Sequence, residues 1–289
     1  IMNDSENRPT SGYVVDIDSE SDFNVPRADN GFTNISECYV SKSGHARMFT
    51  AVRYGKRYVL QCLKTAFRYT PVYRQALMKE FEIGLQLDHP NICRTISMEP
   101  VGDLGECIVM EYVDGETLEA AVKGGKMTEE VVHKIAAQLL DAMEYMHAKQ
   151  IVHRDIKPSN IMYRIRKGEM QCWLIDFGAV ANPQKRSNSS TVAGTCGYMA
   201  PEQLMGMCTP ASDIYSLGMT AVHMLTEEPP WKMPVEGLKI QYEPILRKVR
   251  PDLNESVLNL LRMMTDASLD NRIGSAREIL DILEKIKGT

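Results

Sequence analysis

Residues 151–162 read Ile151-Val152-His153-Arg154-Asp155-Ile156-Lys157-Pro158-Ser159-Asn160-Ile161-Met162, and this stretch decides the fold. Two motifs follow it in order: Asp176-Phe177-Gly178 begins 21 residues after Asp155, and Ala200-Pro201-Glu202 begins 24 residues after Asp176. Any one of these triplets alone is usually structural, with its acid solvated or capping a turn. The ordered series at this spacing is highly specific and indicates one functional unit.

The pattern of apolar residues changes near residue 114. Before it, short β-rich runs predict strands over 35–39, 48–53, 57–63 and 107–112, with one helix over 72–87. After it, helical spacing predicts helices over 128–149, 211–226, 255–264 and 275–286, the first capped by Thr128. The sequence therefore predicts a small antiparallel-sheet lobe joined near 112–115 to a larger helical lobe, and nucleotides commonly bind at such junctions.

Composition excludes several classes of protein. The 289 residues are 44% hydrophobic and carry 33 basic and 38 acidic side chains, a net charge of −5, which argues against a nucleic-acid partner. No apolar run reaches the roughly 18–20 residues of a membrane span. The seven scattered cysteines favour reduced thiols and a cytoplasmic location, although a longer parent protein could be membrane-anchored outside this chain.

The three motifs resemble those of the eukaryotic-like protein kinase family, over about residues 33–288. The resemblance implies an α+β, bilobal kinase fold and a bacterial-looking member of the serine/threonine branch, since Lys157 stands in an Asp-x-Lys-Pro-x-Asn motif. It divides the chain into an acidic N-terminal extension (1–32), a small lobe (33–113) and a large lobe (114–289). Residues 1–30 carry seven acids against two arginines, and we expect 13–15 to form an extra strand or dock on the small lobe.

The same resemblance implies the chemistry of the large lobe. Asp155 matches the base that accepts the proton of the substrate hydroxyl, and Lys157 matches the cation beside the transferring phosphoryl group. Asn160 and Asp176 supply the hard oxygen ligands that suit Mg²⁺. ATP and Mg²⁺ are therefore the expected cofactors, and a protein bearing a serine or threonine hydroxyl is the expected partner.

In the small lobe, Lys64 resembles the lysine that grips the α- and β-phosphates. Its expected partner is the glutamate nine residues before His89, which is Glu80, with Glu82 as the competitor. Met110 matches the gatekeeper, the backbone of Glu111 and Val113 is expected to read the adenine edge, and two side chains are expected above and below the adenine: Cys62 and Met162.

Two departures from the family pattern stand out. Counting back from Lys64, the nucleotide loop lacks the family's glycines, and the residues expected to line ATP there are Ser41, Ser43, Gly44, Ala46 and Met48. Glycine permits close approach of backbone to phosphate, so this loop predicts weaker ATP binding. Gly84, one turn after Glu80, stands where the family packs a large apolar side chain against Phe177.

Three residues are predicted to act in regulation. Thr195 matches the threonine that bridges the catalytic Asp and Lys, and Thr191 stands four residues earlier, where an activating phosphate often falls. Arg154 would pair with that phosphate. Elsewhere, Asp213 resembles the residue that braces the catalytic loop, and Arg272 matches the partner of Glu202.

The sequence therefore predicts an ATP- and Mg²⁺-dependent serine/threonine protein kinase. The first alternative is a pseudokinase scaffold with weak or no catalysis, favoured by the glycine-poor loop and by Gly84. The second is a kinase-fold enzyme that acts on a small molecule, which the Ala200-Pro201-Glu202 motif and Thr195 argue against.

Overall fold

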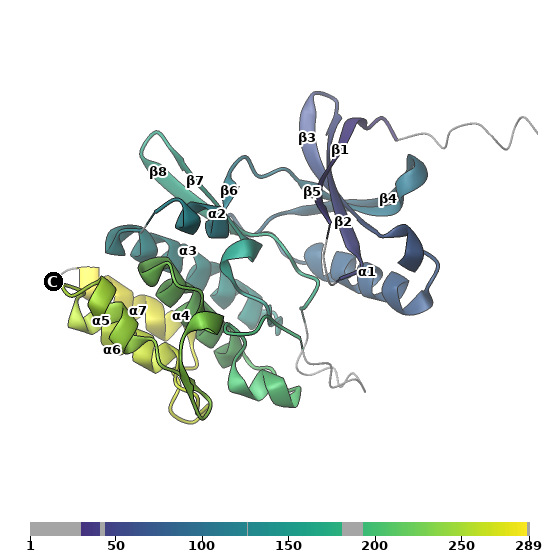
Figure 1. Ribbon diagram of the computed structural model, residues 1–289. Coiled ribbons are helices and arrows are strands. Elements are labelled where there is room, and N and C mark those ends of the chain that lie inside the picture. Colours follow the sequence, from purple (N-terminus) through teal and green to yellow (C-terminus); the bar gives the residue numbers. More distant parts are fainter. Residues whose placement is uncertain (1–29, 41–43, 126, 181–192, 288–289) are drawn as a thin grey trace, which may run out of the picture.

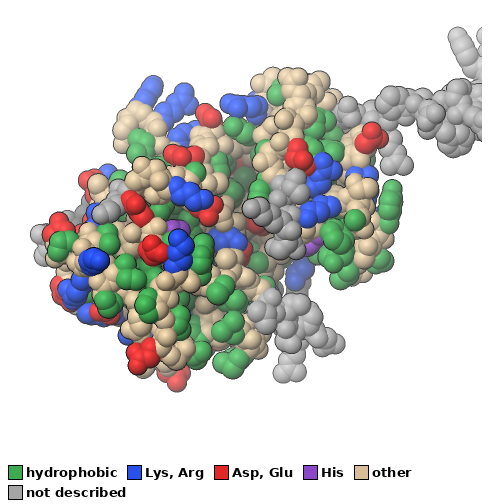
Figure 2. All heavy atoms as spheres, in the orientation of Figure 1, with side chains coloured by type: hydrophobic (Ala, Val, Ile, Leu, Met, Phe, Trp, Pro, Cys, Tyr) green, Lys and Arg blue, Asp and Glu red, His purple; other side chains and the backbone are tan. Residues whose placement is uncertain are grey.

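The computed structural model describes residues 30–40, 44–125, 127–180 and 193–287. The chain folds into two lobes, a sheet with one long helix at the N-terminal end and a mainly helical part at the C-terminal end (Figure 1). In the space-filling view the surface is hollowed between the lobes, where blue and red side chains both gather (Figure 2). The predicted bilobal kinase fold is confirmed.

The small lobe is built on a five-stranded antiparallel sheet in the order β1-β2-β3-β5-β4. Its strands are β1 Thr33–Val40, β2 Ala46–Arg53, β3 Lys56–Leu63, β4 Thr95–Val101 and β5 Gly105–Glu111. Helix α1, Pro71–Gly84, begins with a proline at its first position, where the missing N–H costs nothing. It packs against β3 and β4, so this sheet has one face turned toward α1 and one turned away.

Strand register separates the side chains of these two faces. Residues directly opposite each other on neighbouring strands share a face, and successive residues alternate. One buried cluster, on the face turned away from α1, includes Phe32, Phe49, Leu60, Cys62 and Cys107. The other cluster lies toward α1 and includes Leu63, Leu77, Ile108 and Met110, with Val59, Val113 and Ile175 packed on it. The second face is therefore the one that meets the large lobe.

The large lobe is centred on two long helices. Its helices are α2 Leu118–Lys123, α3 Glu129–Ala148, α4 Pro210–Thr226, α5 Glu243–Val249, α6 Glu255–Met264 and α7 Ala276–Lys287. The Thr128 hydroxyl caps α3 by accepting a hydrogen bond from Val131 N at 3.3 Å, as the sequence predicts. Helix α4 is buried along nearly its whole length, and α3 packs against α4 and α7. The short strands are β6 Glu116–Thr117, β7 Ile161–Arg166, β8 Glu169–Leu174, β9 Val235–Glu236 and β10 Lys239–Ile240.

Several elements differ from the sequence prediction. The predicted bounds of α6, 255–264, agree with the structure. The predicted α1 extended three residues too far, and β4, the β7–β8 hairpin and α5 were not predicted. Strand β4 carries Pro100 and polar residues, so it lacks the alternation that marks a strand. Residues 30–32 pack on the small lobe, since Phe32 is buried and Asn30 Nδ2 donates to Pro100 O at 2.6 Å. The predicted docking of residues 13–15 lies outside the described residues.

Candidate active site

A buried carboxylate shapes the loop that carries Asp155. Asp213, at the start of α4, accepts hydrogen bonds from His153 N at 2.9 Å and Arg154 N at 2.8 Å, and its Oδ2 lies 2.8 Å from His147 Nε2. Burial alone would raise the pKa of Asp213, but these bonds hold it below its ordinary value. Arg154 adopts a left-handed φ of 73°, which Asp213 stabilises by binding two successive N–H groups.

Asp155, Lys157 and Thr195 form a closed triangle at the lobe junction. The Thr195 hydroxyl donates to Asp155 Oδ1 at 2.6 Å and accepts from Lys157 Nζ at 2.6 Å, while Lys157 Nζ lies 2.9 Å from Asp155 Oδ2. The two charged side chains are 16% and 20% exposed, so they are held in place yet reachable. The predicted bridge through Thr195 is present.

Asn160 and Asp176 offer oxygen atoms that fit a divalent cation. Asn160 Nδ2 donates to Asp155 O at 2.9 Å and to Asp155 Oδ2 at 3.0 Å, which leaves the amide oxygen as a ligand. Asp176 Oδ1 accepts from Gly178 N at 2.9 Å. A carboxylate and an amide carbonyl are the hard ligands that Mg²⁺ takes together with phosphate oxygens and water.

Phe177 and Gly84, which the family pattern brings together, each have a separate close neighbour. The rings of His153 and Phe177 meet edge to face with centroids 5.5 Å apart. Gly84 of α1 lies against the side chain of Thr95 of β4, which is buried. A side chain at position 84 would have no room, so Thr95 fills the position that the missing side chain leaves.

Glu80 has a different partner from the predicted one. Both of its carboxylate oxygens accept hydrogen bonds from Gln61 Nε2, each at 3.0 Å. Gln61 lies within β3 with its side chain toward α1, while Lys64 lies one position beyond the last residue of β3. The predicted pairing of Lys64 with Glu80 is therefore wrong, and the competitor Glu82 is exposed on α1.

The electrostatic environment of Glu80 follows from this contact. Burial, followed by the nearby Asp176 carboxylate, raises the pKa of Glu80 to about 8, although hydrogen bonds from Gln61 and from Phe177 N oppose the rise. Lys64 instead lies by the nucleotide loop: its N–H donates to His45 O at 2.8 Å. Burial and the Lys64 charge both lower the pKa of His45, while Asp176 raises it, so the three side chains share one region.

Strand register also corrects one residue expected beside the adenine. Met110, the predicted gatekeeper, pairs with Val59, and Ala46 and Met48 pair with Leu63 and Gln61, so these six residues share the face toward α1. Cys62 pairs with Cys107 and belongs to the buried cluster on the other face. The prediction that Cys62 covers the adenine is therefore wrong, because a strand alternates faces at every residue.

The remaining predicted residues are spread over both lobes and the connection between them, and three lie outside the described chain. Glu111 ends β5, and its N–H donates to Arg94 O at 3.0 Å, while Val113 packs on the cluster toward α1. Met162 lies on β7 of the large lobe, opposite Thr117 and Trp173, and Gly44 lies two residues before β2 begins at Ala46. Ser41, Ser43 and Thr191 lie outside the described residues.

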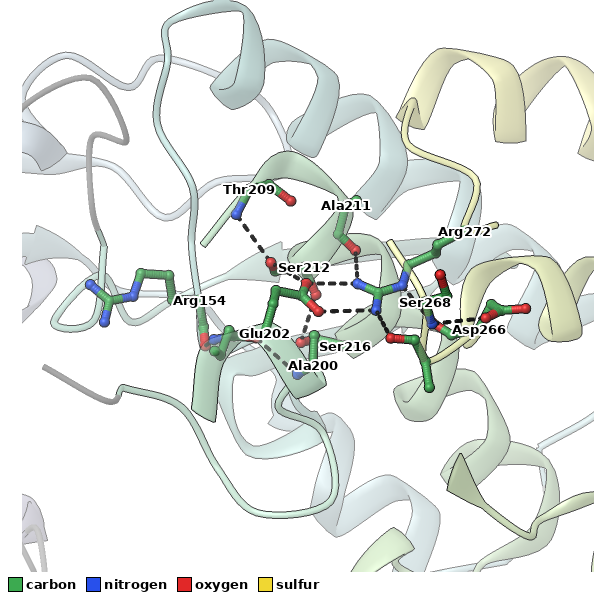
Figure 3. A network of polar contacts seen from close by, with 12 residues as sticks. Arg154, Ala200, Glu202, Thr209, Ala211, Ser212, Ser216, Asp266, Ser268 and Arg272 are labelled. Carbon is green, nitrogen blue, oxygen red and sulfur yellow. Dashed lines mark hydrogen bonds and ion pairs between the residues drawn. The ribbon is translucent and has the colours of Figure 1, made fainter. Parts of the chain in front are cut away.

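A polar network fixes the segment that follows Thr195 (Figure 3). Arg272 holds both carboxylate oxygens of Glu202, with N–O distances of 2.7 and 3.0 Å, and Ser212 Oγ donates to Glu202 Oε1 at 2.6 Å. The side chains of Arg272 and Glu202 are 0% and 4% exposed. The predicted Glu202–Arg272 pair is confirmed. Arg154 lies at the edge of this view with its side chain directed away from the network.

Comparisons with known proteins agree with this geometry. The sequence model described as "Protein kinase domain" matches residues 42–283, so the chain belongs to the protein kinase domain family. It is 45% identical over 137 residues to serine/threonine-protein kinase PknA of Nostoc sp., covering 45% of this chain and 24% of that protein. It is 32% identical to serine/threonine-protein kinase B of Synechocystis sp., covering 70% of this chain and 36% of that protein. The chain thus spans well under half the length of these curated relatives.

Solved structures show the same fold. The kinase domain of PknI from Mycobacterium tuberculosis superposes with a TM-score of 0.67 at 24% identity, covering 90% of this chain and 98% of that chain. The membership in a bacterial, eukaryotic-like serine/threonine kinase family that the motifs predict is confirmed. No helix in the described parts of the chain is long and apolar enough to span a membrane.

Sequence reasoning missed two residues of this site. Gln61 was overlooked because a lysine three positions later also fits the end of an apolar strand. Gln203 was overlooked too: its Nε2 donates to Arg154 O at 2.9 Å and Ala193 O at 3.0 Å, joining the catalytic loop to the segment before Ala200. Motif spacing alone indicates neither the contact of Gln61 nor that of Gln203. The alternation of apolar residues around Val59 and Leu63 could have indicated the face of the sheet on which Gln61 lies.

Proposed function

We propose that the chain is an ATP- and Mg²⁺-dependent serine/threonine protein kinase domain, which transfers the γ-phosphoryl group to a protein hydroxyl. The observation that carries this proposal is the triangle of Asp155, Lys157 and Thr195, in which one hydroxyl fixes a carboxylate and an ammonium at 2.6 Å each. Family membership supports it.

Each residue has a role in this reaction. The substrate oxygen attacks the γ-phosphorus as the bond to the β–γ bridging oxygen breaks, and Asp155 accepts the hydroxyl proton. Lys157 places positive charge beside the transferring group. Asn160 and Asp176 would hold Mg²⁺, which when bound neutralises phosphate charge. Asp213 holds the loop in the conformation that presents Asp155.

Two observations support a protein substrate and a cytoplasmic location. The segment from Thr195 to Glu202 is fixed to the large lobe, which supports a protein rather than a small molecule as acceptor. The cysteines of the described chain are free thiols, and together with the need for ATP they favour the cytoplasm.

A phosphoryl-transfer assay tests the proposal. The protein is incubated with labelled ATP, Mg²⁺ and a generic protein acceptor, and both autophosphorylation and acceptor labelling are measured. Asp155→Asn should lower transfer by about 10²–10⁴ with nucleotide affinity nearly unchanged, because general-base catalysis contributes that much. The matched control is Asp252→Asn, an exposed acid on the connection between α5 and α6, which should be as active as wild type.

The assay also separates the kinase from a pseudokinase. Transfer by wild type that disappears in Asp155→Asn supports the kinase. Wild type that binds ATP but transfers nothing would show a scaffold, and Asp155→Asn as active as wild type would overturn the role of this residue.

A further inference from the structure

In the family pattern one lysine both pairs with the helix glutamate and contacts the nucleotide phosphates. In this chain Gln61 makes the contact with the glutamate, Glu80. A lysine in the place of Gln61 would form an ion pair with the Glu80 carboxylate and would also direct a charged donor at the nucleotide phosphates. Gln61 is 3% exposed, and its Nε2 is shared between the two oxygens of Glu80 at 3.0 Å each. It therefore fixes Glu80 but brings no positive charge.

The contact holds α1 against the sheet at the edge of the nucleotide site. Gln61 lies on β3 opposite Ile108 of β5 and Met48 of β2, on the face toward α1. A Cβ atom built on Gly178 would lie 3.3 Å from Asp176 Oδ1 and 3.5 Å from Glu80 Oε2, so Glu80 stands beside the expected Mg²⁺ ligand. In the part of the chain that the structure describes, Gln61 Oε1 is buried and accepts no hydrogen bond.

Lys64 brings a cation to the same region from the end of the same strand. The backbone N–H of Lys64 donates to His45 O at 2.8 Å, which joins the end of β3 to the residue that precedes β2. The charge of Lys64 and that of Asp176 both act on the His45 ring, with opposite effects on the His45 pKa. Phosphates bound between the loop and Asp176 would therefore lie within reach of the Lys64 ammonium.

We propose that this chain divides the two tasks between two residues: Gln61 is a positioning residue that holds Glu80 and α1, and Lys64 supplies the positive charge to the nucleotide phosphates. The inference deepens the proposed function and rests on it. It predicts that nucleotide binding and the rate of transfer respond separately to changes at these two positions of one strand.

Two single variants test the division. Lys64→Met should weaken ATP binding by about tenfold, as expected for the loss of a charge-assisted hydrogen bond, while the thermal midpoint of the nucleotide-free protein is unchanged. Gln61→Met, similar in volume, should leave ATP affinity within about twofold and lower kcat by about tenfold, because α1 loses its anchor. Lys56→Met, on the exposed start of β3, is the matched control and should change neither quantity.

A double variant supplies the decisive measurement. Gln61→Lys places an ammonium beside Glu80, so it should restore ATP affinity to Lys64→Met. Affinity is measured by calorimetry, which does not depend on phosphoryl transfer. The binding results therefore test the roles of Gln61 and Lys64 even if the protein shows no kinase activity. Unchanged affinity in Lys64→Met, no rescue by Gln61→Lys, or unchanged kcat in Gln61→Met would each overturn the proposal.

Discussion

Gly84 of α1 and Thr95 of β4 touch so closely that a Cβ atom on Gly84 would lie 2.2 Å from Thr95 Oγ1 and 3.0 Å from Thr95 Cβ. Glycine inside a helix costs about 1 kcal/mol relative to alanine. The close approach to Thr95 explains why α1 ends with a glycine despite this cost. The helix and the sheet can meet here only because one partner has no side chain.

Gly84→Ala should therefore destabilise the protein, against the usual preference of helices for alanine. We expect a loss of about 1–3 kcal/mol in the free energy of unfolding, the usual cost of overpacking. Denaturant titration measures it. In a Thr95→Ala background the hydroxyl and methyl groups are gone, and the cost of Gly84→Ala should be smaller. Equal costs in both backgrounds would mean that Thr95 is not the obstacle.

Arg272→Met tests the buried ion pair of the large lobe. Removing one partner leaves the Glu202 carboxylate buried and uncompensated, which should cost about 3–5 kcal/mol in the free energy of unfolding. The control is Arg277→Met, whose contact with Glu144 is 3.7 Å long and whose side chain is 64% exposed, so its loss should cost under about 1 kcal/mol. Similar losses in the two variants would contradict this difference in burial.

Asp176→Ala should abolish the gain in ATP affinity that Mg²⁺ produces. In the proposed function the Asp176 carboxylate, the Asn160 amide and the phosphates would hold the cation, so losing the charged ligand should remove the coupling. Calorimetry with and without Mg²⁺ gives both affinities. Asp252→Ala serves as the exposed control. A full Mg²⁺ effect in Asp176→Ala would assign the metal to other residues.

Glu80 should make stability depend on pH in the neutral range. Its pKa is raised in the folded protein from an ordinary 4.5 to about 8, so the folded state holds a proton that the unfolded chain releases. Its contribution is complete below pH 4.5, declines as the pH rises and levels off above about 8, with a slope of at most about 1.4 kcal/mol per pH unit. Denaturant titrations from pH 5 to 9 should show a weaker slope for Glu80→Gln, and identical slopes would refute this account.

The large lobe could be predicted from the sequence because its functional residues are set by short-range order. Asp155, Lys157 and Asn160 lie in one loop, so their relative positions follow from the spacing. The more distant partners Thr195 and Arg272 were placed by family resemblance, and the structure brings each to its expected contact.

The small lobe could be predicted less well because its site is assembled by strand register. A shift of one residue turns a side chain to the other face of a sheet, and the sequence contains both Gln61 and Lys64 near the right place. The same uncertainty in register explains why Cys62 was predicted on the wrong face of the sheet. The contact of Gly84 with Thr95 could not be predicted, because the polar sequence of β4 lacks the alternation that indicates a strand.

The bond between Glu202 and Arg272 joins residues 70 positions apart, and this has a consequence for the order of events during synthesis. The catalytic loop, the segment from Thr195 to Glu202 and α4 all leave the ribosome before Arg272 exists. Until then, Glu202 must stay in water, because a lone carboxylate cannot be buried without a large cost. The network that fixes the segment from Thr195 to Glu202 can therefore be completed only after Arg272 has been synthesised and has left the ribosome.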